Sequence, residues 1–534
     1  MDSPADGRRT CRGIERLGPR RPTVVLFPTM TFAVFFLIVM PVAWKLRPRP
    51  FAWKLFVLAA SYVFYAGWDW RFVGLLVVST LGNQVAAQVI HRSTTDRSRR
   101  GGLVGGLVMN LGLLGFFKYY GFFVESLIDL LQPLGLAPTS LLIEITLPVA
   151  ISFFTFCGIS YIIDVHRGSL HPAPLLDLAV YLAFFPHLVA GPIVRGSEIL
   201  PQLRRLPETR VVDATRAARL ITRGLVKKVI VADFLARVIT DPVFHAPRGY
   251  KAWDLLIGAY AFSVQIYADF SGYTDIAIGC ALLLGIRFPQ NFDRPYVAAT
   301  LQEFWRRWHM TLSRWLRDYL YIPLGGNRGS RLGQYRNLLL TMLLGGLWHG
   351  ASWNFVIWGG LHGVGLGFER WYSARRALPH RQRGAAVERM RTELGLETAH
   401  GDVPVVGPDG AVRVVEAEEM APHVPNPWIG RLVVFHFVTF AWIFFHTGSP
   451  ADAAQYVSRL FTEWGSTDVV TPMVVVVILA ALAAQYLPPR VGYLFEWRIS
   501  QWPPIVQGLG FSLVLLTCDV LGPQGVAPFI YFQF

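Results

Sequence analysis

Long runs of apolar residues, separated by short polar or basic segments, dominate the chain from Val24 onward. A helix needs about 20 apolar residues to cross a bilayer core, and we count roughly ten to twelve such runs. The pattern therefore predicts an all-α, polytopic transmembrane bundle that also contains interfacial and broken helices. The clearer runs lie at 24–44, 52–68, 71–90, 102–123, 140–163, 174–194, 218–240, 253–286, 429–446, 469–487 and 505–522.

Composition supports a membrane protein and excludes an ordinary soluble domain. Hydrophobic residues make up 53% of the 534 residues and charged residues only 16%, and the mean hydropathy is +0.39. A soluble domain has about 25% charged residues. The net charge of +15 lies in short loops between apolar runs, which is the distribution that orients membrane spans. We therefore assign the charge to topology and expect no nucleic acid partner.

The distribution of basic loops predicts the topology only in part. Two basic loops, 45–54 and 91–100, are separated by two apolar runs, so both can be cytoplasmic. The stretches 195–228 and 287–336 are further cytoplasmic candidates. The Arg-rich N-terminus lies one span before the first of these loops, so parity places it outside.

The chain divides into four parts by composition. We expect the N-terminal part to be a disordered basic extension, or to precede a translation start near Val25. We expect the polar insert to hold one short helix and a flexible Gly/Pro segment, and to carry no chemistry. The parts are 1–23 (extension), 24–372 (membrane core), 373–427 (insert) and 428–534 (C-terminal transmembrane helices of the same core).

The run 338–368 contains the first candidate for chemistry, His349. As one helix this run would be about 46 Å long, against a core of about 30 Å. It is also too short for two full spans and a turn, so we expect a broken or steeply tilted pair, interrupted at the GG and HG pairs. Ionisable groups at such breaks usually face a wet cavity. A neutral imidazole there is suited to take a proton from a hydroxyl. The alternative is a structural histidine that binds a carbonyl freed by the break.

The segment Glu303–Leu320 contains the second candidate, His309. On a helical wheel its large apolar side chains gather on one side and its arginines on the other. This pattern predicts a continuous amphipathic helix at the membrane surface, with tryptophans at headgroup depth. His309 lies at the seam, where an interfacial histidine without a task is an equal alternative. The apolar side comprises Trp305, Trp308, Leu312, Trp315 and Leu316.

Two further polar features lie in apolar runs, His362 and the carboxylate pair Asp269 and Asp275. His362 follows His349 by thirteen residues, about 220° around a continuous helix, so we expect it to face away and to be structural. Asp269 and Asp275 lie in an apolar span, where carboxylates must be paired or hydrated. We favour structural pairing over the proton relay of a transporter.

The loop Tyr321–Gly333 combines glycines with Arg328 and Arg331. Its backbone N–H groups and guanidinium groups are able to hold a phosphate, although a plain cytoplasmic turn has the same composition. The four cysteines are far apart and lack metal-site spacing, and no serine-nucleophile motif is present. We therefore expect no metal site and no disulfide framework.

Several long strings resemble the membrane-bound O-acyltransferase family, and in particular its bacterial branch of alginate O-acetyltransferases and D-alanyl transfer proteins. The strings that carry the resemblance are QNFDRPYVAATLQEFWRRWHMTLSRWLRDYLYIPLGGNR, LLGGLWHGASWNFVIWGGLHG, LPVAISFFTFCGISYIIDVHRG, FFPHLVAGPIVR, GLVKKVIVADFLA, QIYADFSGYTDIAIG and GPQGVAPFIYFQF. The resemblance implies a multi-helix enzyme in which two funnels meet near a family histidine, here His349. The second family position falls on His309.

The resemblance also implies the reaction. The family moves an acyl group from a cytoplasmic thioester to a hydroxyl, and this branch delivers it to an extracytoplasmic polymer or a partner protein. We therefore expect a bacterial plasma-membrane O-acyltransferase, more narrowly an O-acetyltransferase, that modifies an exported polysaccharide or cell-envelope glycan. The donor would be acetyl-coenzyme A or an acyl-carrier thioester, and no tightly bound cofactor is expected. An extracytoplasmic partner transferase and the insert as its docking surface are part of this hypothesis.

In this hypothesis His349 is the base that activates the acceptor hydroxyl. His309 positions the donor, stabilises the oxyanion or holds His349 in place. Arg306, Arg307 and Arg328 contact the donor phosphates. The alternatives are a transporter or flippase of a polymer-export system, a non-catalytic scaffold, and transfer of D-alanyl or another acyl group to a teichoic-acid-like polymer.

Overall fold

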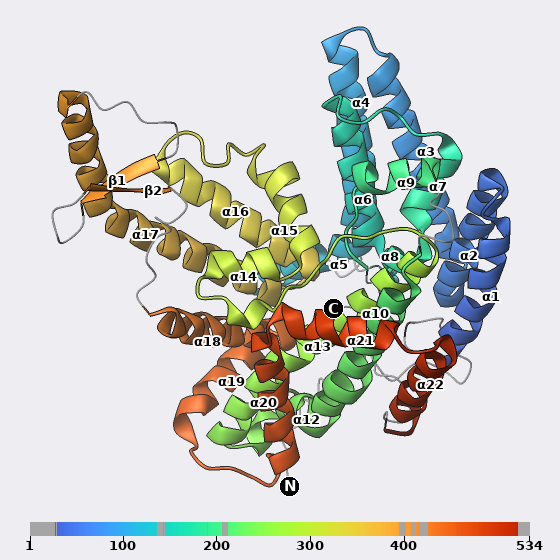
Figure 1. Cartoon of the computed structure of the whole chain (residues 1–534). Coiled ribbons are helices and arrows are strands. Elements are labelled where there is room, and N and C mark those ends of the chain that lie inside the picture. The colour runs from blue at the N-terminus through green and yellow to red at the C-terminus, as the bar shows by residue number, and fades with distance from the viewer. Residues whose placement is uncertain are drawn as a thin grey trace.

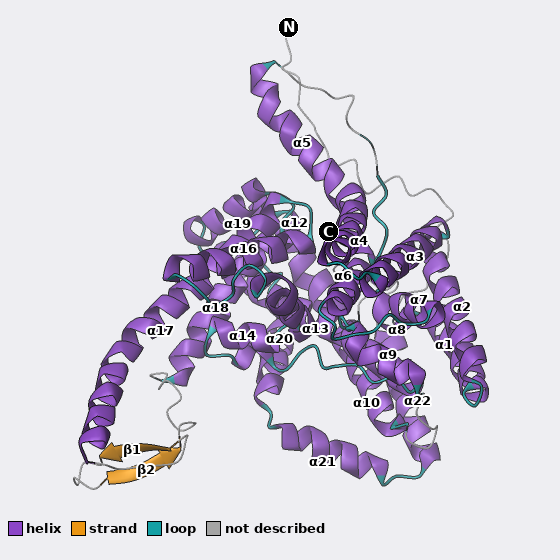
Figure 2. Cartoon of the chain, turned by 90° about the horizontal axis from the view of Figure 1, so that it is seen from above, coloured by secondary structure: helices purple, strands orange, loops and turns teal. Residues whose placement is uncertain are grey.

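The computed structural model describes residues 27, 29–135, 143, 145–189, 191–205, 212–394, 402–406, 412–416 and 426–521. This part of the chain is almost entirely helical, and its strands form a single two-stranded hairpin (Figures 1 and 2). The predicted all-α class is therefore confirmed. The expected disordered extension 1–23 and the C-terminal string 522–534 lie outside the described residues.

The N-terminal third follows the predicted spans closely. The first three helices each coincide with one apolar run, and the turns before α2 and α4 coincide with the basic loops. A π-helical turn, η1, interrupts the fourth run and joins two helices into one long element. The elements are α1 (Met30–Leu46), α2 (Pro50–Asp69), α3 (Arg71–Arg92), α4 (Asp96–Leu114), η1 (Gly115–Tyr119), α5 (Tyr120–Leu131) and η2 (Gln132–Leu134).

The middle third is more fragmented than its hydrophobic pattern predicts. The predicted span 174–194 breaks at Phe184, because Pro186 has no N–H to bond to the preceding turn and its ring crowds that turn. The long helix α13 lies at the centre of the molecule (Figure 1). The elements are α6 (Ile151–His166), α7 (Leu175–Ala183), α8 (Phe185–Leu188), α9 (Gly196–Arg204), α10 (Ala214–Leu225), η5 (Val226–Ala232), α11 (Asp233–Leu235), η6 (Ala236–Thr240), α12 (Asp241–His245), η7 (Pro247–Gly249) and α13 (Ala252–Leu283).

The last third contains the segments that carry the candidate histidines, followed by the insert and the C-terminal helices. Its elements are η8 (Pro295–Val297), α14 (Leu301–Arg307), α15 (Met310–Leu316), η9 (Arg317–Tyr321), α16 (Arg331–His349), α17 (Trp353–Leu394), β1 (Asp402–Val406), β2 (Val412–Glu416), α18 (Pro427–His446), α19 (Pro450–Thr462), α20 (Pro472–Tyr486), α21 (Pro489–Ser500) and α22 (Pro504–Leu521).

Four helices of the described part are long and apolar enough to cross a membrane, or five if the bent pair α20–α21 counts as one span. They are Pro50–Asp69, Arg71–Arg92, Asp96–Leu134 and Pro427–His446. This number is below the predicted ten to twelve, because several predicted runs are divided into short helices and π turns. Shorter apolar helices lie at Met30–Leu46, Ile151–His166 and Ile505–Cys518.

The insert departs from the expectation of one short helix. Its helical part is the continuation of α17, which runs away from the helical body as far as Leu394 (Figure 2). Beyond it, β1 and β2 pair in antiparallel register, with Asp402 opposite Glu416. Periodicity alone does not show that the helix starting at Trp353 continues through the change from apolar to polar composition.

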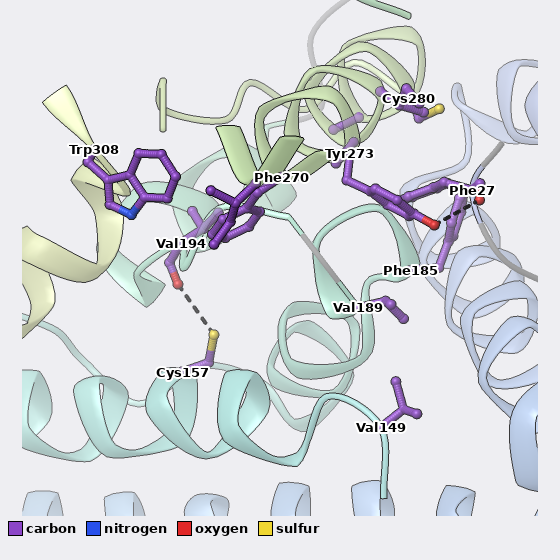
Figure 3. Close-up of a cluster of buried hydrophobic side chains, with 14 of the residues drawn as sticks. Phe27, Val149, Cys157, Phe185, Val189, Val194, Phe270, Tyr273, Cys280 and Trp308 are labelled. Atoms are coloured by element: carbon purple, nitrogen blue, oxygen red, sulfur yellow. Dashed lines mark hydrogen bonds between the residues drawn. The ribbon is translucent and has the colours of Figure 1, made fainter. Parts of the chain in front are cut away.

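The hydrophobic core joins segments from across the chain, as Figure 3 shows for one cluster. Tyr273 on α13 donates a hydrogen bond to the carbonyl of Phe27 (3.3 Å), and the Cys157 thiol lies 3.5 Å from the carbonyl of Val194. Cys157, Cys280 and Cys518 are buried, free thiols. Trp308, one of the predicted surface tryptophans, belongs to this core.

Candidate active site

The candidate site is built around the turn between α16 and α17. Helix α16 ends at His349, Gly350 is extended (φ −159°), and α17 begins at Trp353. The predicted break at the HG pair is therefore confirmed, whereas the GG pair lies inside α16. Both helices are long, because α16 begins at Arg331 and α17 continues into the insert.

Glycines allow α16 and α17 to touch along their backbones. A Cβ atom at Gly346 would lie 2.2 Å from the carbonyl oxygen of Phe355, and one at Gly359 would lie 2.3 Å from that of Met342. Real Cβ atoms do not come so close, so both positions require glycine. Small residues at such contacts are typical of helix pairs in membranes. The glycines of this segment therefore fix the spacing of the two helices.

His349 is buried (4% exposed) in an aromatic environment. Its ring centroid lies 5.0 Å from that of Trp348, 5.1 Å from Trp358 and 5.4 Å from Phe445. Trp348 also lies 6.0 Å from the His309 ring, and Trp358 lies 4.8 Å from the His362 ring. The structure thus places the predicted base among other titratable groups and large apolar rings.

His309 lies at a break between α14 and α15, so the predicted continuous amphipathic helix is wrong. Trp308 is extended (φ −97°, ψ 129°) and His309 has left-handed backbone angles (φ 41°, ψ 53°). A non-glycine residue in this region costs about 1–3 kcal/mol and persists only where its surroundings hold it. The break turns Trp308 and Trp315 into the protein, where both are buried rather than exposed on an outer face.

Asn291 holds His309 in this conformation. Its side-chain oxygen accepts hydrogen bonds from the Thr311 N–H (3.2 Å), the Thr311 hydroxyl (2.8 Å) and His309 Nδ1 (3.2 Å). The backbone carbonyl of Asn291 accepts from the Met310 N–H at 2.9 Å. Because this side-chain oxygen is an acceptor, the proton of a neutral His309 resides on Nδ1.

This tautomer determines which hydrogen bond the free Nε2 atom of His309 can form with a substrate. Its Nε2 is buried and has no hydrogen-bond partner within the described ranges. Neutral His309 therefore accepts, but does not donate, a hydrogen bond at Nε2. Of the predicted roles, oxyanion stabilisation would require the protonated form. The rings of His309 and Trp348 lie 6.0 Å apart, so Trp348 contacts both candidate histidines.

His362 does not face away from His349 as predicted. The break at Gly350 removes the continuous helical register on which that prediction depended. The Trp358 ring lies 5.1 Å from His349 and 4.8 Å from His362, so it connects the two. Trp305 Nε1 donates to His362 Nδ1 (3.3 Å), which places the proton of a neutral His362 on Nε2.

Sequence interpretation missed Lys118, which reaches the same site from η1. Its ammonium group donates to the carbonyls of Trp348 (2.5 Å) and His349 (3.3 Å) and to the Ser152 hydroxyl (3.2 Å). A signal was available, because a lysine inside the apolar run 102–123 is costly unless it has a partner or a function.

The predicted phosphate-binding arginines are not equivalent. Arg307 is already paired with Glu303 (2.9 Å) and Asp293 (3.2 Å). Arg306 and Arg328 are exposed. Arg328 belongs to a loop whose glycines adopt left-handed angles, including Gly325 (φ 114°). Arg306 and Arg328 therefore keep guanidinium groups accessible to an anion, whereas Arg307 has a structural pairing.

Two further arginines near His309 are paired with one carboxylate, that of Asp318. Arg195 lies 2.8 Å and Arg317 2.6 Å from the carboxylate of Asp318. Desolvation tends to raise the pKa of Asp318, but these guanidinium groups hold that pKa below its ordinary value. This carboxylate therefore stays ionised and keeps both arginines in place.

The carboxylates of α13 are paired, as predicted. Arg223 binds Asp275 through two hydrogen bonds (2.8 and 2.6 Å), and Lys227 binds it at 2.8 Å. Lys228 lies 2.7 Å from Asp269 and 2.8 Å from Asp233. The partners come from α10 and η5, so these charges link α13 to its neighbours.

A known protein family and several individual proteins are similar to much of this chain. The model of the membrane-bound O-acyltransferase family matches residues 166–388, which include both candidate histidines. A protein named Probable alginate O-acetylase, from Azotobacter vinelandii, is 44% identical over 351 residues, covering 65% of this chain and 69% of that protein. The Peptidoglycan O-acetyltransferase of Helicobacter pylori is 39% identical over 384 residues, covering 66% of this chain and 72% of that protein.

A more distant relative has a different acyl group in its name. The Teichoic acid D-alanyltransferase of Bacillus subtilis is 31% identical over 258 residues, covering 43% of this chain and 62% of that protein. The shared feature of these relatives is acyl transfer. With the helical fold, the apolar spans and the matched histidine segments, they show that this chain belongs to the membrane-bound O-acyltransferase family of enzymes.

Proposed function

We propose that this protein transfers an acetyl group from a thioester donor to a hydroxyl group of an exported polysaccharide or cell-envelope glycan. The observation that carries the proposal is the convergence of His309 and His349 on Trp348 in a buried aromatic site. The names of the more similar relatives favour acetyl over D-alanyl transfer, since those with 44% and 39% identity are named as acetylating enzymes.

In the proposed reaction His349 acts as the general base. Its imidazole takes the proton of the acceptor hydroxyl while the hydroxyl oxygen attacks the thioester carbonyl carbon. The tetrahedral intermediate collapses, the C–S bond breaks, and the departing thiolate takes the proton back from the imidazolium. Proton transfer of this kind contributes about 10²- to 10⁴-fold in rate. No covalent enzyme intermediate is needed, because both substrates gain from orientation at one centre.

His309 has a complementary role in this proposal. Its unoccupied Nε2 is a hydrogen-bond acceptor, which suits it to hold a donor group of either substrate beside His349. Its strained backbone, fixed by Asn291, supports this role, because such strain gathers at functional sites. The strained backbone therefore fixes the orientation of the His309 ring.

The proposed donor is acetyl-coenzyme A or an acylated carrier, bound from the cytoplasmic side of the bacterial inner membrane. Both carry phosphates, and the exposed Arg306 and Arg328 supply guanidinium groups for them. The acceptor side would receive the exported polymer, directly or through a partner transferase.

The test is the O-acetyl content of the cell-surface polymer, measured by NMR in a deletion strain. The strain carries the wild-type chain, His349→Gln, or a control, His187→Gln, at matched membrane levels. His187 is also buried, but it lies among Tyr181, Phe184 and Phe288. We expect acetylation to be lost with His349→Gln and retained with His187→Gln. Full acetylation by His349→Gln would refute the role of this histidine as the base.

Transport is the less supported alternative. A proton path along α13 would need carboxylates able to exchange protons, but Asp269 and Asp275 are held in ion pairs. Transfer of radiolabel from acetyl donor to polymer by membranes separates the two functions, since a transporter would give none.

A further inference from the structure

The C-terminal end of α16 has an unusual set of partners. The last carbonyls of a helix have no partner within the helix, and burial away from water makes this costly. Here the carbonyl of Leu347 accepts from the Tyr119 hydroxyl (2.9 Å), and those of Trp348 and His349 accept from Lys118. Two consecutive residues of η1 thus satisfy three consecutive carbonyls that end at His349.

The π-helical turn explains how two neighbouring side chains reach one helix end. Gly115–Tyr119 widens the helix between α4 and α5, which rotates the side chains that follow relative to α4. Such turns recur at functional sites. Without the extra residue, the positions of Lys118 and Tyr119 relative to α16 would shift by about 100° around the helix.

The contacts of Lys118 define its role. An ammonium group has three donors, and Lys118 has three acceptors: two carbonyls of α16 and the Ser152 hydroxyl of α6. Its donors are therefore used by the protein. In its protonated form Lys118 also places a positive charge at the negative end of the α16 dipole, where a cation is favourable. Its ammonium group lies 5.8 Å from the Trp348 ring, which contacts both candidate histidines.

We propose that Lys118 and Tyr119 form a clamp that fixes the last turn of α16 and so positions His349 for proton transfer. The proposal rests on the proposed function of His349, but assigns to the clamp only the placement of that ring. A displacement of about 1 Å at a catalytic group can cost about 10²-fold in rate. The clamp thus explains why a lysine is buried here, although Lys118 takes no part in the proton transfer itself.

The test uses the full-length protein in detergent, with acetyl transfer to an oligosaccharide acceptor as the assay. We expect Lys118→Met to lower kcat about 10- to 100-fold with KM changed less than about threefold, and Tyr119→Phe to lower kcat by less. Lys118→Arg, which keeps the charge and the donors, should recover most of the activity. The control is Lys227→Met, because that lysine pairs with Asp275 away from the clamp and Arg223 remains as a partner.

A second measurement does not depend on acyl transfer. Hydrogen–deuterium exchange of the peptide spanning residues 344–352 should be faster in Lys118→Met than in the wild type and in Lys227→Met. If the wild-type protein transfers no acetyl group but exchange is still faster in Lys118→Met, the clamp is supported and the proposed function is rejected. Wild-type kcat and exchange in Lys118→Met would overturn the clamp. An inactive Lys118→Arg with wild-type exchange would also overturn it, since lysine would then act chemically.

Discussion

The α16–α17 site and the contact of α13 with α10 and η5 both bury polar groups in an apolar protein, but they treat them differently. At α13, Lys228 contacts two carboxylates and Asp275 contacts two cations. At the other site, His309 Nε2, His362 Nε2 and Trp358 Nε1 have no hydrogen-bond partner within the described part of the chain. Buried polar groups are normally satisfied. The paired charges of the first region therefore have a structural role. In the second region, water or substrate would supply the missing hydrogen-bond partners.

Replacing His349 by Gln should give the largest effect and should separate activity from stability. We expect acetyl transfer to fall about 10²- to 10⁴-fold, or about 3–5 kcal/mol in the activation barrier. The melting temperature in detergent should stay close to that of the wild type, since glutamine has a similar volume. A large loss of melting temperature with normal activity per folded molecule would assign His349 to the structural class.

Replacing Lys228 by Met should give the opposite result. It leaves the buried carboxylates of Asp233 and Asp269 without their shared cation, and breaking a buried pair in this way costs about 3–5 kcal/mol. We expect lower membrane levels and a lower melting temperature, with activity per folded molecule unchanged. The double variant Lys228→Met/Asp269→Asn should recover part of the loss. Normal stability together with lost activity would place this pair in the catalytic machinery.

Asn291→Ala tests the strained backbone at His309. It removes the acceptor shared by His309 and Thr311, which costs about 1–3 kcal/mol if the donors stay buried. We expect an activity loss of about tenfold, because the His309 ring is no longer fixed. Asn291→Asp keeps the acceptor and should lose less. Equal activity of Asn291→Ala and the wild type would show that the orientation of His309 is unimportant.

Arg223→Gln should give the smallest effect. The Arg223 side chain is 46% exposed and Asp275 keeps Lys227 as a partner, so solvent screening limits the loss to about 1 kcal/mol or less. Melting temperature and activity should both stay near wild type. A loss comparable to that of Lys228→Met would mean that the α13 charges act as one network.

Local sequence predicted much of this molecule and failed where distant residues decide the backbone. Apolar runs located the first helices, and the Gly-rich segment located the break beside His349. The break at His309 was not predicted, because Glu303–Leu320 has helical periodicity and its interruption depends on Asn291, distant in sequence. The error about His362 has the same origin, since one break changes which side chains meet. Lys118 contacts carbonyls about 230 residues away, a pairing that no local pattern contains.

The backbone contact at Gly346 and Gly359 has a consequence for engineering. Because α16 and α17 cannot slide or separate there without losing this contact, more space beside His349 would have to come from smaller side chains in place of Trp348 or Trp358. A chimera designed to exchange acyl preference between relatives should therefore take helices α16 and α17 together from one parent. Crossover points within residues 331–372 would combine an α16 and an α17 from different parents, whose backbones are not matched to each other. We expect chimeras with crossover points outside this range to fold.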